Sequence, residues 1–187
     1  MKRSDQSGAT EEAIRRAVVQ LMNDIDYDRI TADAVAKQAG VSRSTFYRYF
    51  DSVVDAVETI EQEFLELVRE VNRIALQCAR DLSDASGLTQ SMVSRMEHIL
   101  QHRDFIIAVD GPHGDRTFRG RAEKVMSDYL FTRLQSDPST FEEKSLYVEF
   151  VSAGHYRMIY RWLVDFPTVP AARVAAMTNK LLYSIFR

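Results

Sequence analysis

The sequence is poor in the features that mark secreted and membrane-spanning proteins. Its single cysteine, Cys78, excludes a disulfide framework and a cysteine-based zinc site within one chain. The position of Cys78 on the apolar stripe of a predicted helix favours packing over nucleophilic chemistry. No apolar run approaches the roughly 20 residues of a membrane span, and no signal-peptide pattern opens the chain. We therefore expect a cytoplasmic protein with no membrane partner.

The sequence also lacks an overall basic excess. The formal net charge is −3. Hydrophobic residues make up 45% of the chain, which is sufficient for a core. A protein that coats nucleic acid along its whole surface is expected to be basic. The charge is unevenly distributed, however, and residues 29–50 carry four basic residues against one acidic residue: Arg29, Lys37, Arg43 and Arg48 against Asp33. Any contact with nucleic acid is therefore expected to be local.

Motifs of catalysis are missing as well. The chain has no glycine-rich phosphate loop, nucleophile elbow, paired carboxylates on one helix face or complete metal site. His98 and His102 are four residues apart, a spacing that binds a metal when a third ligand such as Asp104 or His113 converges. Surface or helix-capping roles are the ordinary alternative for these histidines. We expect neither an enzyme nor a bound cofactor or metal.

The hydrophobic pattern is helical along the whole chain. Apolar residues recur at steps of three and four, and there is no strand signal or internal repeat. This predicts an all-α fold of about nine helices. The expected spans are residues 10–25, 32–39, a short helix after 42, 53–82, 89–102, 105–109, 116–135, 141–165 and a last helix after 170.

The segment from residue 30 to residue 50, ITADAVAKQAGVSRSTFYRYF, predicts two short helices joined by a tight turn. Thr31 and Ser42 are good N-caps, because a hydroxyl accepts a hydrogen bond from an unpaired backbone N–H in the first turn. Gly40 ends the first helix, since glycine adopts the left-handed C-cap without strain. This is the helix-turn-helix arrangement, in which the second helix is free to enter a major groove of DNA.

The second of these helices separates an inward from an outward face. Phe46 and Phe50 are four residues apart and are expected in the core. The residues on or near the outside are basic, hydroxylated or aromatic: Arg43, Ser44, Thr45, Tyr47, Arg48 and Tyr49. Arginine reads guanine edges or neutralises phosphate, and hydroxyl groups donate to phosphate oxygens. A solvated amphipathic helix is the alternative, but caps, glycine and basic face together favour DNA contact.

The run IT-x-x-x-VAKQAGVS-x-ST-FY-x-YF, followed by a long helix, resembles the DNA-binding domain of the TetR family of transcriptional regulators over about residues 10–60. The resemblance implies an all-helical homodimer that binds a palindromic double-stranded operator. It also implies repression that is relieved when a small effector binds the C-terminal domain. We expect a three-helix DNA-binding domain at residues 1–52 and a larger helical effector-binding and dimerisation domain at residues 53–187.

The resemblance also assigns roles by position. It implies contacts to the DNA backbone from four residues: Thr31, Thr45, Tyr47 and Tyr49. It implies that three others face bases or nearby phosphates: Arg43, Ser44 and Arg48. The chain departs from the family at Val53, where many members carry a lysine. This departure predicts a missing phosphate contact, and it keeps open an alternative function as a co-regulator or activator that acts through a protein partner.

The two C-terminal helices carry apolar residues on more than one side, which predicts a further partner. Gly154 lies in mid-helix, where glycine costs about 1 kcal/mol relative to alanine, so a close helix approach is expected there. We predict a four-helix bundle formed by these helices and their copies in a second subunit. The candidate interface residues are Tyr147, Val151, Gly154, Met158, Trp162, Val174, Leu181 and Ile185.

The middle helices contain methionine and aromatic residues with a few polar tips, a composition that suits an apolar or aromatic small-molecule effector. The candidate effector-binding residues are Met92, Met96, Phe105, Phe118, Met126, Tyr129, Phe150, His155 and Tyr156. Ordinary core packing is the alternative reading for each of them taken singly.

Overall fold

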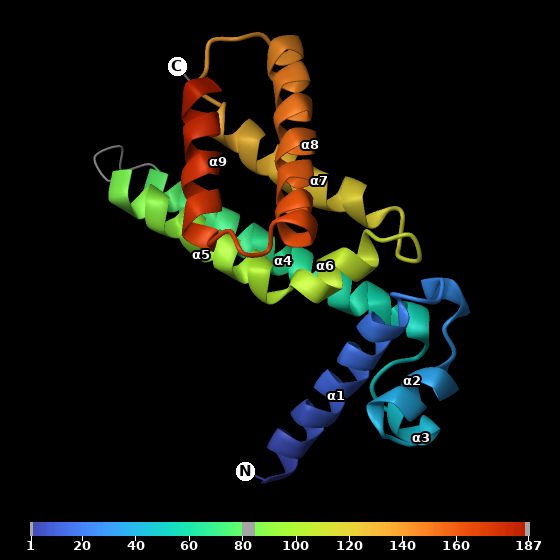
Figure 1. Ribbon diagram of the computed structural model, residues 1–187. Coiled ribbons are helices and arrows are strands. Elements are labelled where there is room, and N and C mark those ends of the chain that lie inside the picture. Colours follow the sequence, from blue (N-terminus) through green and yellow to red (C-terminus); the bar gives the residue numbers. More distant parts are fainter. Residues whose placement is uncertain (1, 80–84, 186–187) are drawn as a thin grey trace. The chain divides into compact units, whose positions relative to one another are not determined.

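The computed structural model describes the backbone of residues 2–79 and 85–185, and side-chain burial for residues 7–77 and 90–182 (Figure 1). Within these ranges all regular structure is helical, which confirms the predicted all-α fold. The elements are α1 (Lys2–Leu21), a 3-10 turn (Tyr27–Arg29), α2 (Ala32–Ala39), α3 (Arg43–Phe46), α4 (Val53–Ala79), α5 (Ala85–Gln101), α6 (Arg103–Val109), α7 (Phe118–Arg133), α8 (Phe141–Asp165) and α9 (Ala171–Ile185). The Cys78 side chain lies outside the described residues.

The chain forms two compact units. Unit 1 consists of Met1–Phe64 and Asp104–Phe118, and unit 2 consists of Leu65–Arg103 and Arg119–Arg187. Helix α4 therefore contributes its first part to unit 1 and its second part to unit 2. The domain boundary at residue 52 stays a prediction, and the compact units divide the chain further along, inside α4.

Helix α1 begins earlier and ends earlier than its apolar stripe predicts. It starts at Lys2, and its last helical residue is Leu21. The Asn23 side chain ends it, because the amide donates to the carbonyl oxygens of Val19 and Gln20 at 3.3 and 3.1 Å. Helix α1 packs against α2 in unit 1, with Ile14 fully buried.

Three phenylalanines join the later part of unit 1 to the start of α4. The ring centroids of Phe64 and Phe105 are 5.7 Å apart, those of Phe64 and Phe118 are 6.1 Å apart, and those of Phe105 and Phe118 are 5.6 Å apart. Aromatic pairs at this spacing add to the stability that burial provides. The cluster attaches α6 and the first residue of α7 to the head of the chain.

One hydrophobic cluster of unit 2 is formed by residues of α4, α7 and α8 and by Leu134, which follows α7. Its buried members are Ala75, Met126, Tyr129, Leu130, Leu134, Val148 and Val151. Helix α8 starts with a capping box in which Thr140 and Glu143 satisfy each other's backbone N–H groups. Helices α8 and α9 run antiparallel (Figure 1). The Trp162 indole N–H donates to the Val169 carbonyl at 2.8 Å and so links α8 to the segment that connects the two helices.

Candidate nucleic-acid interface

The turn between α2 and α3 has the predicted geometry. The Thr31 hydroxyl accepts a hydrogen bond from the Ala34 N–H at 3.2 Å. Gly40 has φ of 68°, the left-handed conformation that carries a penalty for residues with a Cβ. The Val41 N–H then donates to the Ala36 carbonyl at 2.9 Å, which closes the helix end. These local bonds set the angle at which the chain enters α3.

Helix α3 is short, and its hydroxyl residues form a network around the N-cap. The Ser42 Oγ accepts from the Thr45 N–H at 3.0 Å and lies 2.8 Å from both the Ser44 Oγ and the Thr45 Oγ1. The regular α-helix ends at Phe46. The turns that follow are tighter, with the Arg48 N–H donating to the Thr45 carbonyl at 3.2 Å. Only the beginning of the outward face therefore lies on regular helix.

Two phenylalanines hold this short helix on unit 1. Phe46 has no exposed surface and Phe50 is buried, as their spacing predicts. Their ring centroids are 6.1 Å apart. Because the inward positions are filled by these rings, the residues between them are directed outward. The position of the outward face is thus decided by core packing rather than by the outward residues themselves.

The outward face carries two arginine–tyrosine pairs. The guanidinium carbon of Arg43 lies 5.5 Å from the Tyr47 ring centroid, and that of Arg48 lies 5.2 Å from the Tyr49 ring centroid. Cations over aromatic rings are attracted by the ring quadrupole. Arg43, Tyr47 and Arg48 are exposed, and Tyr49 is half-buried. Such pre-positioned cations suit phosphate or base edges.

Arg43 also bridges the two helices of the motif. Its guanidinium is 3.2 Å from the Asp33 carboxylate and donates to the Tyr47 hydroxyl at 3.4 Å. The Tyr47 hydroxyl and then the Asp33 carboxylate raise the pKa of Arg43 above its ordinary value, so the side chain stays charged at every physiological pH. Asp33 orients Arg43, and it also places a negative charge beside the candidate surface.

The Tyr49 hydroxyl, which is predicted to contact a DNA phosphate, already makes a hydrogen bond within the chain. Its hydroxyl donates to the Ser7 carbonyl at 3.2 Å and lies 3.1 Å from the Ser7 Oγ. This bond connects the end of the recognition segment with α1. The structure therefore supports a positioning role for Tyr49 within unit 1 alongside the predicted DNA contact.

A bidentate ion pair holds α1 against the start of α4. The two terminal nitrogens of Arg15 lie 2.6 and 2.9 Å from the Glu63 carboxylate oxygens, and one of them is 2.7 Å from Glu11. These carboxylates, Glu63 foremost, raise the pKa of the half-buried Arg15 above its ordinary value. Fork-to-fork pairs of this kind fix orientation as well as charge. This ion pair joins α1 to α4, the helices that precede and follow the helix-turn-helix in sequence.

Val53 does not have the environment that its departure from the family pattern suggested. Its side chain is 5% exposed and belongs to the core of unit 1 at the first residue of α4. The loss of a phosphate contact through the absent lysine stays a prediction. Ser52 caps the helix, with the Asp55 N–H donating to its Oγ at 3.0 Å.

We expect Val53→Lys to lower the free energy of unfolding by about 1–3 kcal/mol rather than to tighten DNA binding, because an ammonium group would replace a buried methyl pair. Urea denaturation measures the loss. Val54→Lys, at the half-buried neighbouring position, is the matched control with a smaller loss. Unchanged stability together with tighter and more salt-dependent DNA binding would show that the new lysine reaches phosphate.

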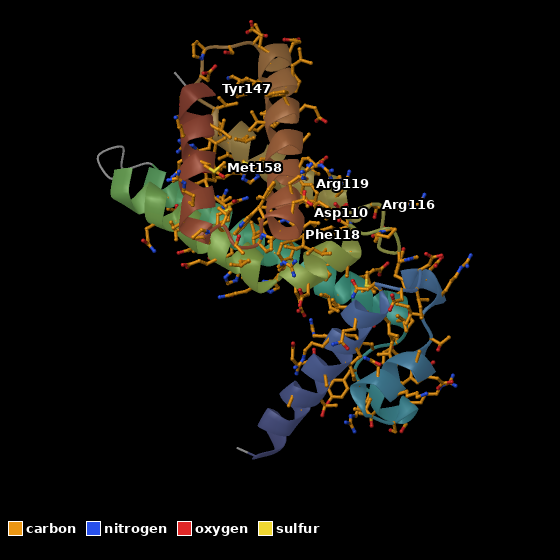
Figure 2. The ribbon with its side chains drawn as sticks, in the orientation of Figure 1. Asp110, Arg116, Phe118, Arg119, Tyr147 and Met158 are labelled. Atoms are coloured by element: carbon orange, nitrogen blue, oxygen red, sulfur yellow. The ribbon has the colours of Figure 1, made fainter. Side chains whose placement is uncertain are left out.

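The candidate effector residues divide between the units. Phe105 and Phe118 belong to the aromatic cluster of unit 1. Unit 1 ends at Phe118, and the next residue, Arg119, belongs to unit 2; both residues are labelled in Figure 2. Six lie within unit 2 with buried or half-buried side chains: Met92, Met96, Met126, Tyr129, His155 and Tyr156. Phe150 is 76% exposed, so its placement in an interior site is wrong. Phe150 is next in sequence to the buried Val151, and the apolar pattern of the helix does not distinguish the two positions.

The candidate dimer residues need a similar correction. Val151, Trp162 and Val174 are buried within their own chain and are removed from the exposed interface. Tyr147 and Met158, both on α8 (Figure 2), are half-buried, and Tyr147 packs against the core of unit 2. Gly154 and Leu181 are exposed. The Ile185 side chain lies outside the described residues.

Arg95 is a buried charged residue that the sequence pattern did not single out. This arginine is buried on α5 in unit 2, between Met92 and Met96 on the apolar stripe of the helix. The signal was present in the pattern, because Arg95 is three residues after Met92 and four before Ile99, and both are buried. A charge at such a position is costly unless it is paired.

Two of the histidines are held by hydrogen bonds, one of them to a residue distant in sequence. The His102 Nδ1 is 2.9 Å from the His98 carbonyl oxygen, and the His113 Nδ1 is 2.8 Å from the Asp26 carboxylate. Where the chain is described, no three potential metal ligands converge. None of the described helices combines the length and apolarity that a bilayer crossing requires.

Two sequence profiles match the chain. One, described as bacterial regulatory proteins of the tetR family, matches residues 14–52, and the other, described as a transcriptional regulator C-terminal region, matches residues 88–184. A curated relative from Bacillus subtilis (strain 168), the uncharacterized HTH-type transcriptional regulator YxbF, is 22% identical over 157 residues. The match covers 83% of this chain but 38% of that protein, so the chain spans well under half of this relative.

Solved structures show the same fold. The dihydroxyacetone kinase operon activator DhaS has a TM-score of 0.62 at 16% identity, with 94% of each chain covered. The Thermus thermophilus FadR repressor in complex with lauroyl-CoA has a TM-score of 0.54 at 20% identity, covering 92% of this chain and 93% of that one. FadR from Bacillus subtilis in complex with stearoyl-CoA has a TM-score of 0.55 at 16% identity, covering 92% and 97%.

Proposed function

Because the chain belongs to the TetR family of bacterial transcriptional regulators, a family of regulators and not of enzymes, we propose that it represses transcription by binding a palindromic operator as a homodimer and leaves the DNA when a small effector binds. The observation that carries the DNA-binding part is the outward face of α3. Arg43 on α3 and Arg48 in the turn that follows lie over tyrosine rings, and the buried Phe46 anchors this segment. Groups held in place lose little entropy on binding.

The proposal of a homodimer rests on an apolar surface of α8 and α9. Large apolar residues on these helices are exposed to between 48% and 76%, far more than core residues: Leu146, Phe150, Met177 and Leu181. On α8, Leu146, Phe150 and Gly154 follow at four-residue steps and so share one face. A Cβ at Gly154 would meet nothing within 4 Å in its own chain. This open position suits the close approach of a second copy.

A two-fold dimer explains the palindrome. An isologous interface repeats every contact about its axis, so the two α3 segments read identical half-sites in opposite directions. Half-sites of such dimers are spaced by about one helical turn of DNA or a multiple of it. One α3 alone has a short contact surface, and the second copy supplies the additional affinity.

The effector proposal rests on the interior of unit 2. Met92, Met96 and Met126 are buried there, and flexible thioether side chains repack around irregular ligands. Two FadR proteins of similar fold were solved with acyl-CoA thioesters bound. An apolar or amphipathic effector is therefore the ligand class that we propose for this chain.

Replacing Arg48 by alanine tests the DNA-binding proposal. We expect specific binding to weaken by about 1–3 kcal/mol if Arg48 reads a base, with a smaller loss on unrelated DNA. Fluorescence anisotropy with the DNA upstream of the protein's own gene, repeated on a shuffled duplex over a series of salt concentrations, measures both quantities. Arg69→Ala, which removes an exposed arginine from unit 2, is the control. Equal losses on both duplexes would make Arg48 a phosphate contact, and wild-type binding that is weak and identical on both would contradict the operator proposal.

The fold is compatible with repression and with activation, so the second candidate function is an activator or co-regulator. A structure described as an operon activator and others described as repressors share the same architecture. An activator or co-regulator would work through a protein partner. A reporter gene behind the bound DNA fragment separates the two, since deletion of a repressor raises expression and deletion of an activator lowers it.

A further inference from the structure

Arg95 occupies a place where an arginine is rarely stable. It lies in the middle of α5, and its side chain is 2% exposed. Met92, one turn earlier on the helix, and Met96, the next residue, are buried and apolar. Moving an ionised group from water into such surroundings is costly unless an opposite charge or several hydrogen bonds compensate.

Among the described residues no carboxylate acts on the Arg95 charge, and burial lowers the pKa of Arg95 although the Tyr129 side chain opposes this. The Nε and both terminal nitrogens of Arg95 are buried, and none makes a hydrogen bond of ordinary geometry with the described residues, so the nearby Tyr129 side chain compensates the charge only in part. Arg15 in unit 1 is the instructive contrast, because its guanidinium is less buried and yet pairs with two carboxylates. A guanidinium has five N–H donors in a fixed fork that matches a carboxylate or phosphate. Arg95 presents this fork without a carboxylate among the described residues.

Two side chains from other helices of unit 2 face Arg95. The Tyr129 ring of α7 lies with its centroid 4.9 Å from the guanidinium carbon, which favours the cation. His155 of α8 is close enough that the Arg95 charge acts on it. Burial, and secondly Arg95, lower the pKa of His155 to about 3, so its ring is neutral, and its buried Nε2 has no partner among the described residues.

We propose that Arg95 binds the acidic group of the effector, that the His155 Nε2 lies beside that group as a second polar contact, and that an apolar body extends over the methionines of the same core. The effector is thus an amphipathic organic anion with a carboxylate head. This proposal rests on the proposed effector-responsive function and specifies its ligand chemistry. Met92 is one turn before Arg95 on α5, and Met126 shares a hydrophobic cluster with Tyr129, whose ring lies against the guanidinium, so thioethers are available near the charge.

Charge balance explains why the ligand is an anion. A neutral apolar ligand would bury the guanidinium further without supplying an acceptor, which adds to the cost. A carboxylate supplies two acceptors in the geometry of the guanidinium fork and neutralises the charge. Because Arg95 is almost fully enclosed, the ligand displaces methionine side chains when it enters. Binding is thereby linked to a rearrangement of α5 within unit 2, which is a means of signalling.

The test uses the whole chain and Arg95→Met, which keeps an unbranched, flexible side chain and removes the guanidinium and its charge. Thermal unfolding is followed with hexanoate, dodecanoate and benzoate, each compared with its neutral alcohol, hexanol, dodecanol or benzyl alcohol. We expect at least one carboxylate to raise the wild-type Tm and its alcohol to raise it much less. In Arg95→Met the apparent affinity for that carboxylate falls about 10- to 100-fold, the range for losing a hydrogen-bonded charge. Arg69→Met, at an exposed arginine of unit 2, responds like the wild type.

The unliganded proteins give a second readout. Arg95→Met is expected to have the same Tm as the wild type or a higher one, since an incompletely compensated buried charge is removed. A large fall in the Tm of unliganded Arg95→Met would show that the guanidinium is paired within its own chain, and it overturns the proposal. So does a wild type that responds to none of the three carboxylates, or a variant that responds as the wild type does.

Failure of this proposal and failure of the proposed function are distinguishable. The DNA affinity and the oligomeric state of Arg95→Met are measured on the same samples. We expect DNA affinity to match the wild type in the absence of ligand, because Arg95 belongs to unit 2 and the α3 surface to unit 1. We expect the oligomeric state to match as well, because Arg95 is buried and is not part of the exposed apolar surface of α8 and α9. DNA binding that persists while the carboxylate response is absent would refute the role of Arg95 and leave the regulator intact.

Discussion

Phe150→Glu is expected to turn the proposed dimer into folded monomers. The Phe150 side chain is 76% exposed in its own chain, so the substitution removes little of the core. In a two-fold interface the substitution acts twice, and each new carboxylate is buried against apolar residues without a partner. Such a charge costs several kcal/mol, so the dissociation constant of the dimer is expected to rise by about a thousandfold or more.

Sedimentation equilibrium over a range of protein concentrations measures this change. Gln77→Glu adds the same charge at an exposed residue of α4 in unit 2, and this variant is expected to remain dimeric. Operator affinity is a second readout, because a monomer loses the effective concentration of the second half-site, commonly a factor of about 100 or more. A Phe150→Glu protein that stays dimeric at micromolar concentration would show that the dimer forms through another surface.

Phe46→Ala is expected to unfold the DNA-binding head and abolish operator binding. Phe46 has no exposed surface, and its ring packs against Phe50 in the core behind α3. Truncation of a buried phenylalanine to alanine costs about 3–5 kcal/mol. Domains are only marginally stable, so this loss is comparable with the stability of a small three-helix head.

The single tryptophan of the chain allows the two units to be followed separately. Trp162 is buried in unit 2, so its fluorescence reports the unfolding of that unit, while far-UV circular dichroism reports all the helices. In Phe46→Ala we expect an early loss of helical signal with an unchanged Trp162 transition. Tyr47→Ala, at the exposed neighbouring position, serves as the control and costs little stability. If Phe46→Ala unfolds in one late transition like the wild type, the head is not held by this ring.

Local signals predicted the head because its structure depends on local interactions. Thr31 and Ser42 accept hydrogen bonds from N–H groups three residues away, and Gly40 adopts a left-handed conformation that a residue with a Cβ rarely adopts. Each of these preferences acts within one turn of helix and therefore shows in the order of residues. The start of α1 was less predictable, because the polar residues before Thr10 show no helical stripe.

Long-range packing explains the burial that the sequence pattern did not predict. Val53 and Phe150 are both apolar residues on helices, but Val53 is in the core and Phe150 is on the surface. On α8, apolar residues occur all round the helix, so periodicity does not say which side faces its own chain. Likewise, a phenylalanine in sequence between methionines of unit 2 does not reveal that Phe105 packs with Phe64.

By itself, the sequence determined that the chain is helical throughout and carries a helix-turn-helix with a basic, aromatic outward face at residues 43–49. It did so because caps, glycine and helical period act over a few residues. Only the tertiary structure decided which apolar residues are left exposed on α8 and α9, and that Arg95 is enclosed without a carboxylate partner among the described residues. Burial and charge compensation depend on residues that are distant in sequence, and folding alone brings them together.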